Sequence, residues 1–148
     1  MIPIVKKLSD TAIWPTKAYE GDAGFDVYSD SEDVTLGFGE RHRFKLGFAL
    51  ELHDGWVALI QEKSGTAVEN GIFTIGNVID SGYRGEVHAI LCCLNSEPVT
   101  IRKGQKVAQM LILPCYTGMR ISASNELSPS SRGRRGFGSS GLEATDER

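Results

Sequence analysis

Short strand-like segments separated by turn residues run through most of this sequence, and they restrict the chain to an all-β fold. Apolar residues occupy every second position from Phe44 to Leu50, the pattern of a strand with one buried face. Three further segments, 56–60, 87–94 and 107–113, are apolar almost throughout. Because such runs are typical of strands covered on both faces, we expect a closed barrel or an oligomer core.

Turn residues interrupt these segments at short intervals and leave room for one helix. Gly, Pro, Asn, Asp or Ser mark turns at residues 53–55, 81–82, 95–98 and 103–104. Their spacing is close to that of a β-sandwich or barrel. The sequence predicts a short helix with Ser64 as its N-cap, residues 66–70 as its turns and Gly71 as its C-terminal stop.

The length and charge indicate one acidic domain with a tail. A chain of 148 residues is the usual size of a single domain. Small and polar residues replace the apolar pattern from about residue 122, so we expect a core of residues 1–121 and a mobile arm of residues 122–148. The formal net charge of -3 argues against a dedicated nucleic-acid-binding protein.

The cysteines and the lack of long apolar runs point to a cytoplasmic protein, or a protein of the host cytoplasm if the source is a phage or virus. Cys92, Cys93 and Cys115 are odd in number and lack metal-ligand spacing, so we expect reduced core residues. No apolar run approaches the ~20 residues of a membrane span. Residues 1–10 contain no signal-peptide core, and we expect neither export nor membrane association.

Residues 132–141, RGRRGFGSSG, have a composition suited to a polyphosphate bound to a flat ring. Arginines pair with phosphate oxygens in a bidentate way, glycines allow close approach of backbone N–H groups, and Phe137 can lie against a base. A disordered basic tail is the alternative interpretation of the same composition.

The segment around Ser64 and Gly65 has the features of a phosphate site, because Lys63 and a helix N-terminus follow an apolar strand. The alternative is an ordinary helix cap beside a surface lysine. Asp80 enters a predicted tight turn three residues before Tyr83, where the carboxylate could activate water and the ring could support a sugar. The alternative there is an Asx turn in a plain hairpin.

Two polar residues interrupt otherwise strand-like segments. A carboxylate at Asp26 requires a positive partner or a hydrogen-bond network if it is buried. Gln109 likewise requires partners for its amide. A hydrated magnesium site would satisfy both side chains, and so would a buried ion pair and a core hydrogen bond.

Five segments in order make the chain resemble the homotrimeric dUTPases. They are AGFDVYSD at residues 23–30, KSGTA at 63–67, GNVIDSGYRGEV at 76–87, GQKVAQM at 104–110 and RGRRGFGSSG at 132–141. The resemblance implies a distorted jelly-roll β-barrel with one short helix, in which three chains share three active sites. It implies hydrolysis of dUTP to dUMP and pyrophosphate with Mg²⁺, which keeps uracil out of DNA and supplies dUMP for dTMP synthesis.

The resemblance also implies a role for each residue of these segments. Asp80 would be the general base for the attacking water, Tyr83 would stack under the deoxyribose, and Asp26 and Gln109 would contact Mg²⁺ through water. Asn77, Val78 and Ile79 would read the uracil, mostly through main-chain groups, and Phe137 would cover it. The residues implied at the phosphates are Lys63, Ser64, Gly65, Arg132, Gly138, Ser139 and Ser140.

Some positions depart from the family pattern. Lys63 stands where most members have arginine, which replaces a bidentate fork with a point charge. Gly82 and Thr66 replace a frequent aspartate and a common leucine, and Arg134 and Arg135 add unexplained charge to the arm.

Two alternative functions remain on the same scaffold. A dCTP deaminase is disfavoured because its Arg-Ser-Ser segment and catalytic glutamate are lacking here. A non-catalytic regulatory protein is disfavoured by the retention of Asp80 with Tyr83.

Overall fold

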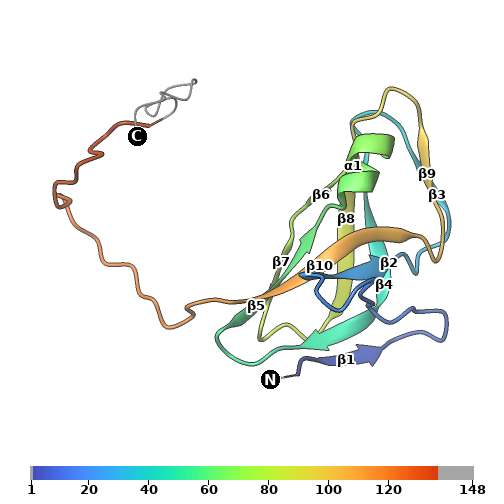
Figure 1. Ribbon diagram of the computed structural model, residues 1–148, viewed down its shortest axis with the longest axis horizontal. Coiled ribbons are helices and arrows are strands. Elements are labelled where there is room, and N and C mark those ends of the chain that lie inside the picture. Colours follow the sequence, from blue (N-terminus) through green and yellow to red (C-terminus); the bar gives the residue numbers. More distant parts are fainter. Residues whose placement is uncertain (1, 137–148) are drawn as a thin grey trace. The chain divides into compact units, whose positions relative to one another are not determined.

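The computed structural model describes residues 2–136 and consists mainly of antiparallel strands (Figure 1). The elements follow one another in the order β1 (Ile4–Lys7), β2 (Gly24–Tyr28), β3 (Val34–Leu36), β4 (Arg41–Glu51), β5 (Trp56–Gln61), α1 (Ser64–Asn70), β6 (Ile72–Ile75), β7 (Val78–Asp80), β8 (Glu86–Cys93), β9 (Val99–Ile101) and β10 (Lys106–Pro114). One four-stranded sheet has the order β1-β4-β8-β6, a second has the order β2-β10-β5-β7, and β3 pairs with β9.

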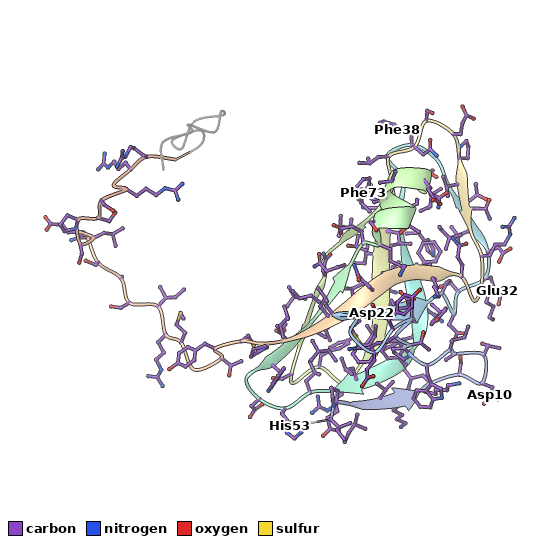
Figure 2. All side chains as sticks on the ribbon, in the orientation of Figure 1. Asp10, Asp22, Glu32, Phe38, His53 and Phe73 are labelled. Carbon is purple, nitrogen blue, oxygen red and sulfur yellow. The ribbon has the colours of Figure 1, made fainter. Side chains whose placement is uncertain are left out.

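A single apolar core holds the two large sheets together. Every second residue from Phe44 to Leu50 on β4 is at most 2% exposed, which confirms the predicted alternation. These side chains pack with Ile60 of β5, Val87 of β8 and Met110 of β10. Figure 2 shows side chains occupying the space between the strands, with His53 labelled at the end where β1 begins and Phe38 at the opposite end of the same view.

The fold class is confirmed, but the closed barrel, one of the two expected ways to cover the apolar strands, is wrong. The sheets stay open at their edges and do not close into a barrel. Within one chain, strand β8 is not covered on both faces, because its residues alternate between buried and half-buried, and an oligomer core stays a prediction. One chain supplies only one covering layer, so the second face of this apolar strand stays partly exposed.

The cysteines differ in burial. The structure pairs none of the three cysteines with another, and only Cys93 is buried as predicted for a core residue. Cys92 and Cys115 are half-buried and lie at the margin of the core. In residues 2–136, no helix is long and apolar enough to cross a membrane.

The chain divides into two compact units, residues 1–118 and residues 119–148. The strands found in residues 2–136, together with α1, belong to the first unit. In the second unit, the described residues 119–136 contain turns but no helix or strand. The predicted closing residues Phe137, Gly138, Ser139 and Ser140 lie outside the described residues.

Candidate active site

An open cavity of about 200 Å³ lies between β7 and the first half of β8. Its lining residues come from β4, β7, β8 and the segments next to β7, and they are Arg43, Gly76, Val78, Ile79, Asp80, Tyr83, Glu86, His88 and Ile90. The sequence-predicted pair Asp80 and Tyr83 therefore shares one cavity with Val78 and Ile79. A cavity of this size suits a small molecule, not a polymer.

The cavity exists because β7 and β8 belong to different sheets. Strand β7 pairs with β5, where Asp80 lies opposite Val57, whereas β8 pairs with β4 and β6. The two strands diverge after the turn of residues 81–85 and cannot form a hairpin ladder. The alternative of a plain hairpin at this turn is therefore wrong.

Asp80 is the last residue of β7, and its side chain is exposed at the edge of the cavity. Its main-chain carbonyl accepts a hydrogen bond from the Tyr83 amide at 3.0 Å, which fixes the turn. Among residues 2–136, no side chain forms an ion pair with the Asp80 carboxylate. The carboxylate is thus available to accept a proton from a ligand or from water.

Tyr83 forms a rigid wall of the cavity. Its hydroxyl donates to the main-chain carbonyl of Glu86 at 2.9 Å. Its ring lies against Gly85, where a Cβ atom would come within 2.7 Å of the ring carbon Cζ. An aromatic ring held in this way offers a flat apolar surface to a ligand.

The sequence analysis missed three charged or titratable residues of the cavity, Arg43, Glu86 and His88. The Glu86 carboxylate accepts a hydrogen bond from the Gly47 amide at 3.2 Å, and its other oxygen lies 3.8 Å from His88 Nε2. Two polar residues at alternate positions of an apolar strand are the signal that would have indicated Glu86 and His88. Arg43 is distant in sequence, and only the pairing of β4 with β8 brings it here.

Asn77 carries an acceptor without a partner. Its side-chain oxygen is the one buried side-chain N or O atom within residues 2–136 that lacks a hydrogen-bond partner. Its main-chain carbonyl accepts from the Ile60 amide at 2.9 Å, so the residue is held firmly beside Val78. A buried acceptor without a protein donor can accept a hydrogen bond from a ligand or from water.

A second cluster of polar side chains surrounds Asp26 on β2. The buried Asp26 carboxylate forms ion pairs with two lysines, Lys63 through Oδ1 and Lys106 through Oδ2, the latter at 2.8 Å. Burial acts to raise the pKa of Asp26, but the bonds from Lys106 and Lys63 lower it below the ordinary aspartate range. The buried ion pair, one of the two alternatives given for Asp26, is thus present, and it involves two lysines that the sequence did not indicate as partners.

Gln109 lies opposite Asp26 in the pairing of β10 with β2, and opposite Gln61 in the pairing of β10 with β5. Its amide nitrogen donates to the main-chain carbonyl of Glu62 at 2.9 Å. This bond ties β10 to the segment that leads into Lys63 and α1. The three strands thereby place Asp26, Gln109 and Lys63 in one neighbourhood.

The start of α1 differs from the prediction. The N-cap is Lys63, in an extended conformation without a side-chain cap, and Ser64 is the first helical residue. Thr66 Oγ1 instead donates to the Lys63 carbonyl at 2.9 Å. The predicted stop at Gly71 is confirmed, since this residue adopts the left-handed conformation. Ser64 and Gly65 are exposed, so their backbone is accessible.

Asp26 and Gln109 fit a magnesium ion only through water. A carboxylate and an amide supply the oxygen donors that Mg²⁺ prefers, and this ion commonly retains several waters. Both carboxylate oxygens of Asp26 already accept lysine ammonium groups. Within the described part of the chain, no cluster of three or more His, Cys, Asp or Glu residues could hold a metal ion.

Arg132 lies in the second unit, in a local turn. Its Nε donates to the carbonyl of Arg135 at 3.1 Å, and Arg135 Nε donates to the carbonyl of Arg132 at 3.1 Å. Both guanidinium groups belong to exposed residues. The role of Arg132 at a phosphate stays a prediction.

Comparison with known proteins identifies the family. The dUTPase family model matches residues 10–141. The deoxyuridine 5'-triphosphate nucleotidohydrolase of Clostridium novyi (strain NT) is 40% identical over 141 residues, which span 94% of this chain and 98% of that protein. The protein of the same name from Clostridioides difficile is 40% identical over 140 residues, 93% of this chain and 96% of its own.

Solved structures support the same assignment. The dUTPase of Staphylococcus bacteriophage 80alpha with dUpNHpp is 28% identical and superposes with a TM-score of 0.81, covering 95% of this chain and 99% of that one. A mutant dUTPase from phage phi11 of S. aureus, described for its structural Mg(II) ion, has a TM-score of 0.77 over 87% of this chain and 100% of its own. At 23% identity, that likeness shows the fold alone.

The fold and the cavity that holds Asp80 and Tyr83 are those of an enzyme, and the chain belongs to the dUTPase family. The predicted family, fold class and enzyme class, dUTP diphosphatase, are confirmed.

Proposed function

We propose that this enzyme hydrolyses dUTP to dUMP and pyrophosphate, with Asp80 as the general base. One observation carries the proposal: the unpaired Asp80 carboxylate and the fixed Tyr83 ring line the same cavity. A carboxylate at the edge of a nucleotide cavity can orient a water and accept its proton as the water attacks the α-phosphorus.

Residues 77–79, of which Val78 and Ile79 line the cavity and Asn77 lies next to them in the chain, would hold the base. The Asn77 side-chain oxygen is buried without a donor, and a uracil N–H would supply one. Val78 and Ile79 present main-chain groups on the same strand. The Tyr83 ring then lies under the deoxyribose, where its bulk disfavours a ribose 2′-hydroxyl.

The phosphates would lie toward the start of α1. Lys63 supplies a positive charge there, and Ser64 and Gly65 supply accessible backbone N–H groups and a hydroxyl. Positive charge and N–H donors reduce the repulsion between a triphosphate and an incoming water. Arg132 adds a bidentate donor for the γ-phosphate in this scheme.

Magnesium bound by the phosphates would neutralise oxygen charge and help orient the triphosphate. Asp26 and Gln109 would hold its water shell, consistent with the donor set they present. The chain's own contribution is to orient the nucleotide, position the proton acceptor and exclude water.

Residues 122–148 act as an arm that closes over the bound nucleotide in this proposal. Phe137 would cover the uracil, and Gly138, Ser139 and Ser140 would close over the phosphates. Closure of a segment over a site excludes bulk water and can limit turnover.

We also infer a homotrimer that shares its active sites and acts in the cytoplasm. Apolar residues stay partly exposed on the outer face of β6 and β8, where Phe73 (37% exposed) lies opposite Cys92 and Ile75 (41%) lies opposite Ile90. A second copy would bury this surface. Removal of dUTP there would keep uracil out of DNA and supply dUMP for dTMP synthesis.

Incubation of the purified protein with dUTP and Mg²⁺, with pyrophosphate release as readout, tests the proposed function. We expect pyrophosphate from dUTP and little from dCTP or dTTP. Ammonia release from dCTP would indicate a deaminase, and binding of dUTP without turnover would indicate a regulatory protein. Either result would reject the proposal.

A further inference from the structure

The first residue of β8, Glu86, connects the Tyr83 ring to a bulge in β4, residues 46–48. The main-chain carbonyl of Glu86 accepts the hydrogen bond from the Tyr83 hydroxyl at 2.9 Å. Its side-chain oxygen Oε1 accepts a second bond, from the Gly47 amide at 3.2 Å. One residue thus holds the ring through its main chain and contacts β4 through its side chain.

The bulge leaves the start of β8 weakly paired. Strand β4 gains residues relative to β8 between Lys45 and Ala49, where the register shifts. Gly47, with a φ of 70°, lies in this stretch. Beyond it, in the ladder that the structure describes, Ala49 and Glu86 form a single further pair. Because the end of a ladder opens more easily than its middle, β8 would be loosely held at Glu86 without another contact.

The Glu86 carboxylate supplies this contact and also pairs a buried amide. Gly47 is buried, and a buried N–H group without an acceptor is unfavourable. The Gly47 carbonyl accepts from the Leu8 amide at 2.8 Å, so both main-chain polar groups of Gly47 have partners. The bulge is thereby tied to the segment that follows β1 on one side and to Glu86 on the other.

The other charged residue near this turn does not provide an equivalent link. Arg84 Nη1 donates to two carbonyls of the turn itself, at 2.6 and 2.9 Å. Its Nη2 lies 3.9 Å from the Glu51 carboxylate on β4, and both side chains are more than half exposed. Exposed ion pairs contribute little to stability. The bond between Glu86 and Gly47 is therefore the side-chain hydrogen bond that links this end of β8 to β4.

We propose that Glu86 is a positioning residue for the selection of deoxyribose. Its carboxylate fixes the start of β8, and with it the carbonyl that holds the Tyr83 hydroxyl, so the ring stays where a ribose 2′-hydroxyl would meet it. The inference rests on the proposed function, because it takes the Tyr83 ring as the surface under the sugar. Glu86 acts through Tyr83 and not on the nucleotide.

Two variants separate the reach of the Glu86 side chain from its charge. Glu86→Gln keeps an oxygen at the same reach but loses the charge near His88, whose Nε2 lies 3.8 Å from Glu86 Oε2. Glu86→Asp keeps the charge but is one methylene shorter. Glu40→Asp is the matched control, because Glu40 Oε2 accepts a similar bond from the Gly37 amide at 2.8 Å and does not line the cavity. Thermal unfolding reports whether each variant retains the fold.

The ratio of kcat/KM for dUTP to kcat/KM for UTP measures the selectivity for deoxyribose. We expect Glu86→Asp to lower this ratio about tenfold, because the ring should shift by less than 1 Å and a 1 Å misplacement can cost about a hundredfold. Glu86→Gln and Glu40→Asp should stay close to the wild type. Equal ratios for Glu86→Asp and Glu40→Asp would overturn the inference. An equal loss in Glu86→Gln would also overturn it, because the charge and not the reach would then be responsible.

A double-mutant cycle with Tyr83→Phe tests whether Glu86 acts through the Tyr83 hydroxyl. Phenylalanine keeps the ring but cannot donate to the Glu86 carbonyl. A residue that acts through this bond has little further effect once the hydroxyl is gone, so Glu86→Asp should lower the ratio much less in the Tyr83→Phe background. An equal loss in both backgrounds would contradict the inference, because Glu86 would then act on the nucleotide or on the fold in general.

NMR of the ligand-free protein separates failure of this inference from failure of the proposed function. In protein labelled with ¹³C at tyrosine Cζ, the Tyr83→Phe variant identifies the Tyr83 signal. We expect this signal to shift in Glu86→Asp and to stay in place in Glu86→Gln and Glu40→Asp. An unmoved signal in Glu86→Asp would overturn the inference even if the wild type hydrolyses dUTP. A shifted signal in a protein that does not hydrolyse dUTP would reject the proposed function, and the role in sugar selection with it.

Discussion

The hydroxyl of Tyr83 donates a hydrogen bond to the main-chain carbonyl of Glu86 at 2.9 Å, so the ring spans the turn between β7 and β8. The ring can lie there because residue 85 is glycine. A Cβ atom at Gly85 would come within 2.5 Å of the Tyr83 hydroxyl oxygen. The position of the Tyr83 ring, the proposed platform for the sugar, therefore depends on Gly85.

Gly85→Ala should displace the Tyr83 ring and lower kcat/KM for dUTP by about ten- to a hundredfold, the usual result of misplacing a bound group by about 1 Å. Gly82→Ala is the matched control in the same turn, because a Cβ atom there meets nothing within 4 Å. Steady-state kinetics of both variants provide the test. Equal kcat/KM values for Gly85→Ala and Gly82→Ala would show that dUTP hydrolysis does not depend on the position of the Tyr83 ring.

Gly47→Ala should destabilise the fold by about 2 to 4 kcal/mol, because it adds backbone strain and overlap together. Gly47 has a φ of 70°, and a Cβ atom would lie 2.6 Å from the Ala12 Cβ and 2.7 Å from an Asp30 carboxylate oxygen. Gly39→Ala shares the positive φ of 77° but has open space, so it isolates the strain. Denaturant unfolding should show a clearly larger loss for Gly47→Ala.

Asp30 should make the fold sensitive to acid. Burial acts to raise the pKa of Asp30, but hydrogen bonds from Ser9 (2.5 Å) and Thr11 (2.6 Å) lower it below the ordinary range. A lowered native pKa contributes stability that is complete above the unfolded-state pKa of about 4 and is lost as the pH falls through the native pKa.

The free energy of unfolding should therefore decrease between about pH 5 and pH 2, and Thr11→Val should reduce this decrease. Thr100→Val, whose hydroxyl contacts only Thr35 and no carboxylate, serves as the control. An unchanged pH slope in Thr11→Val would show that this bond does not hold Asp30 ionised.

Deletion of residues 122–148 should leave the melting temperature of the core within a few degrees of the full chain, because all described strands lie within residues 4–114. The deletion should abolish most dUTP hydrolysis, since it removes Arg132 and the residues proposed to close the site. Circular dichroism and the pyrophosphate assay measure the two effects. Loss of folding would show that the arm belongs to the core.

The fold and half of the cavity were predictable because they depend on local sequence. Alternation from Phe44 to Leu50 identified β4, and the short spacing of Asp80 and Tyr83 placed both at one turn. The N-cap was wrong because Thr66 bonds back to Lys63, a competition that a capping preference does not resolve. Arg43 was not identified from the sequence, because it reaches the cavity only through the pairing of β4 with β8, two strands that are far apart in the chain.

The sequence did not indicate Lys106 as a partner of Asp26 for the same reason. It reaches Asp26 through the pairing of β10 with β2, which contains a register shift between Lys106 and Ala108. A sequence pattern indicates that a buried carboxylate needs a partner, but it does not identify the lysine that lies next to it. The pairing of the strands determines which lysine that is.

The most direct test of the account is the turnover of Asp80→Asn, measured together with its affinity for dUpNHpp. We expect kcat for dUTP to fall by about two to four orders of magnitude while the Kd stays close to that of the wild type, because the amide fills the same space but cannot accept the proton. Asp54→Asn, at an exposed turn outside the cavity, should retain full activity. Turnover of Asp80→Asn near the wild-type rate would contradict the assignment of Asp80 as the general base.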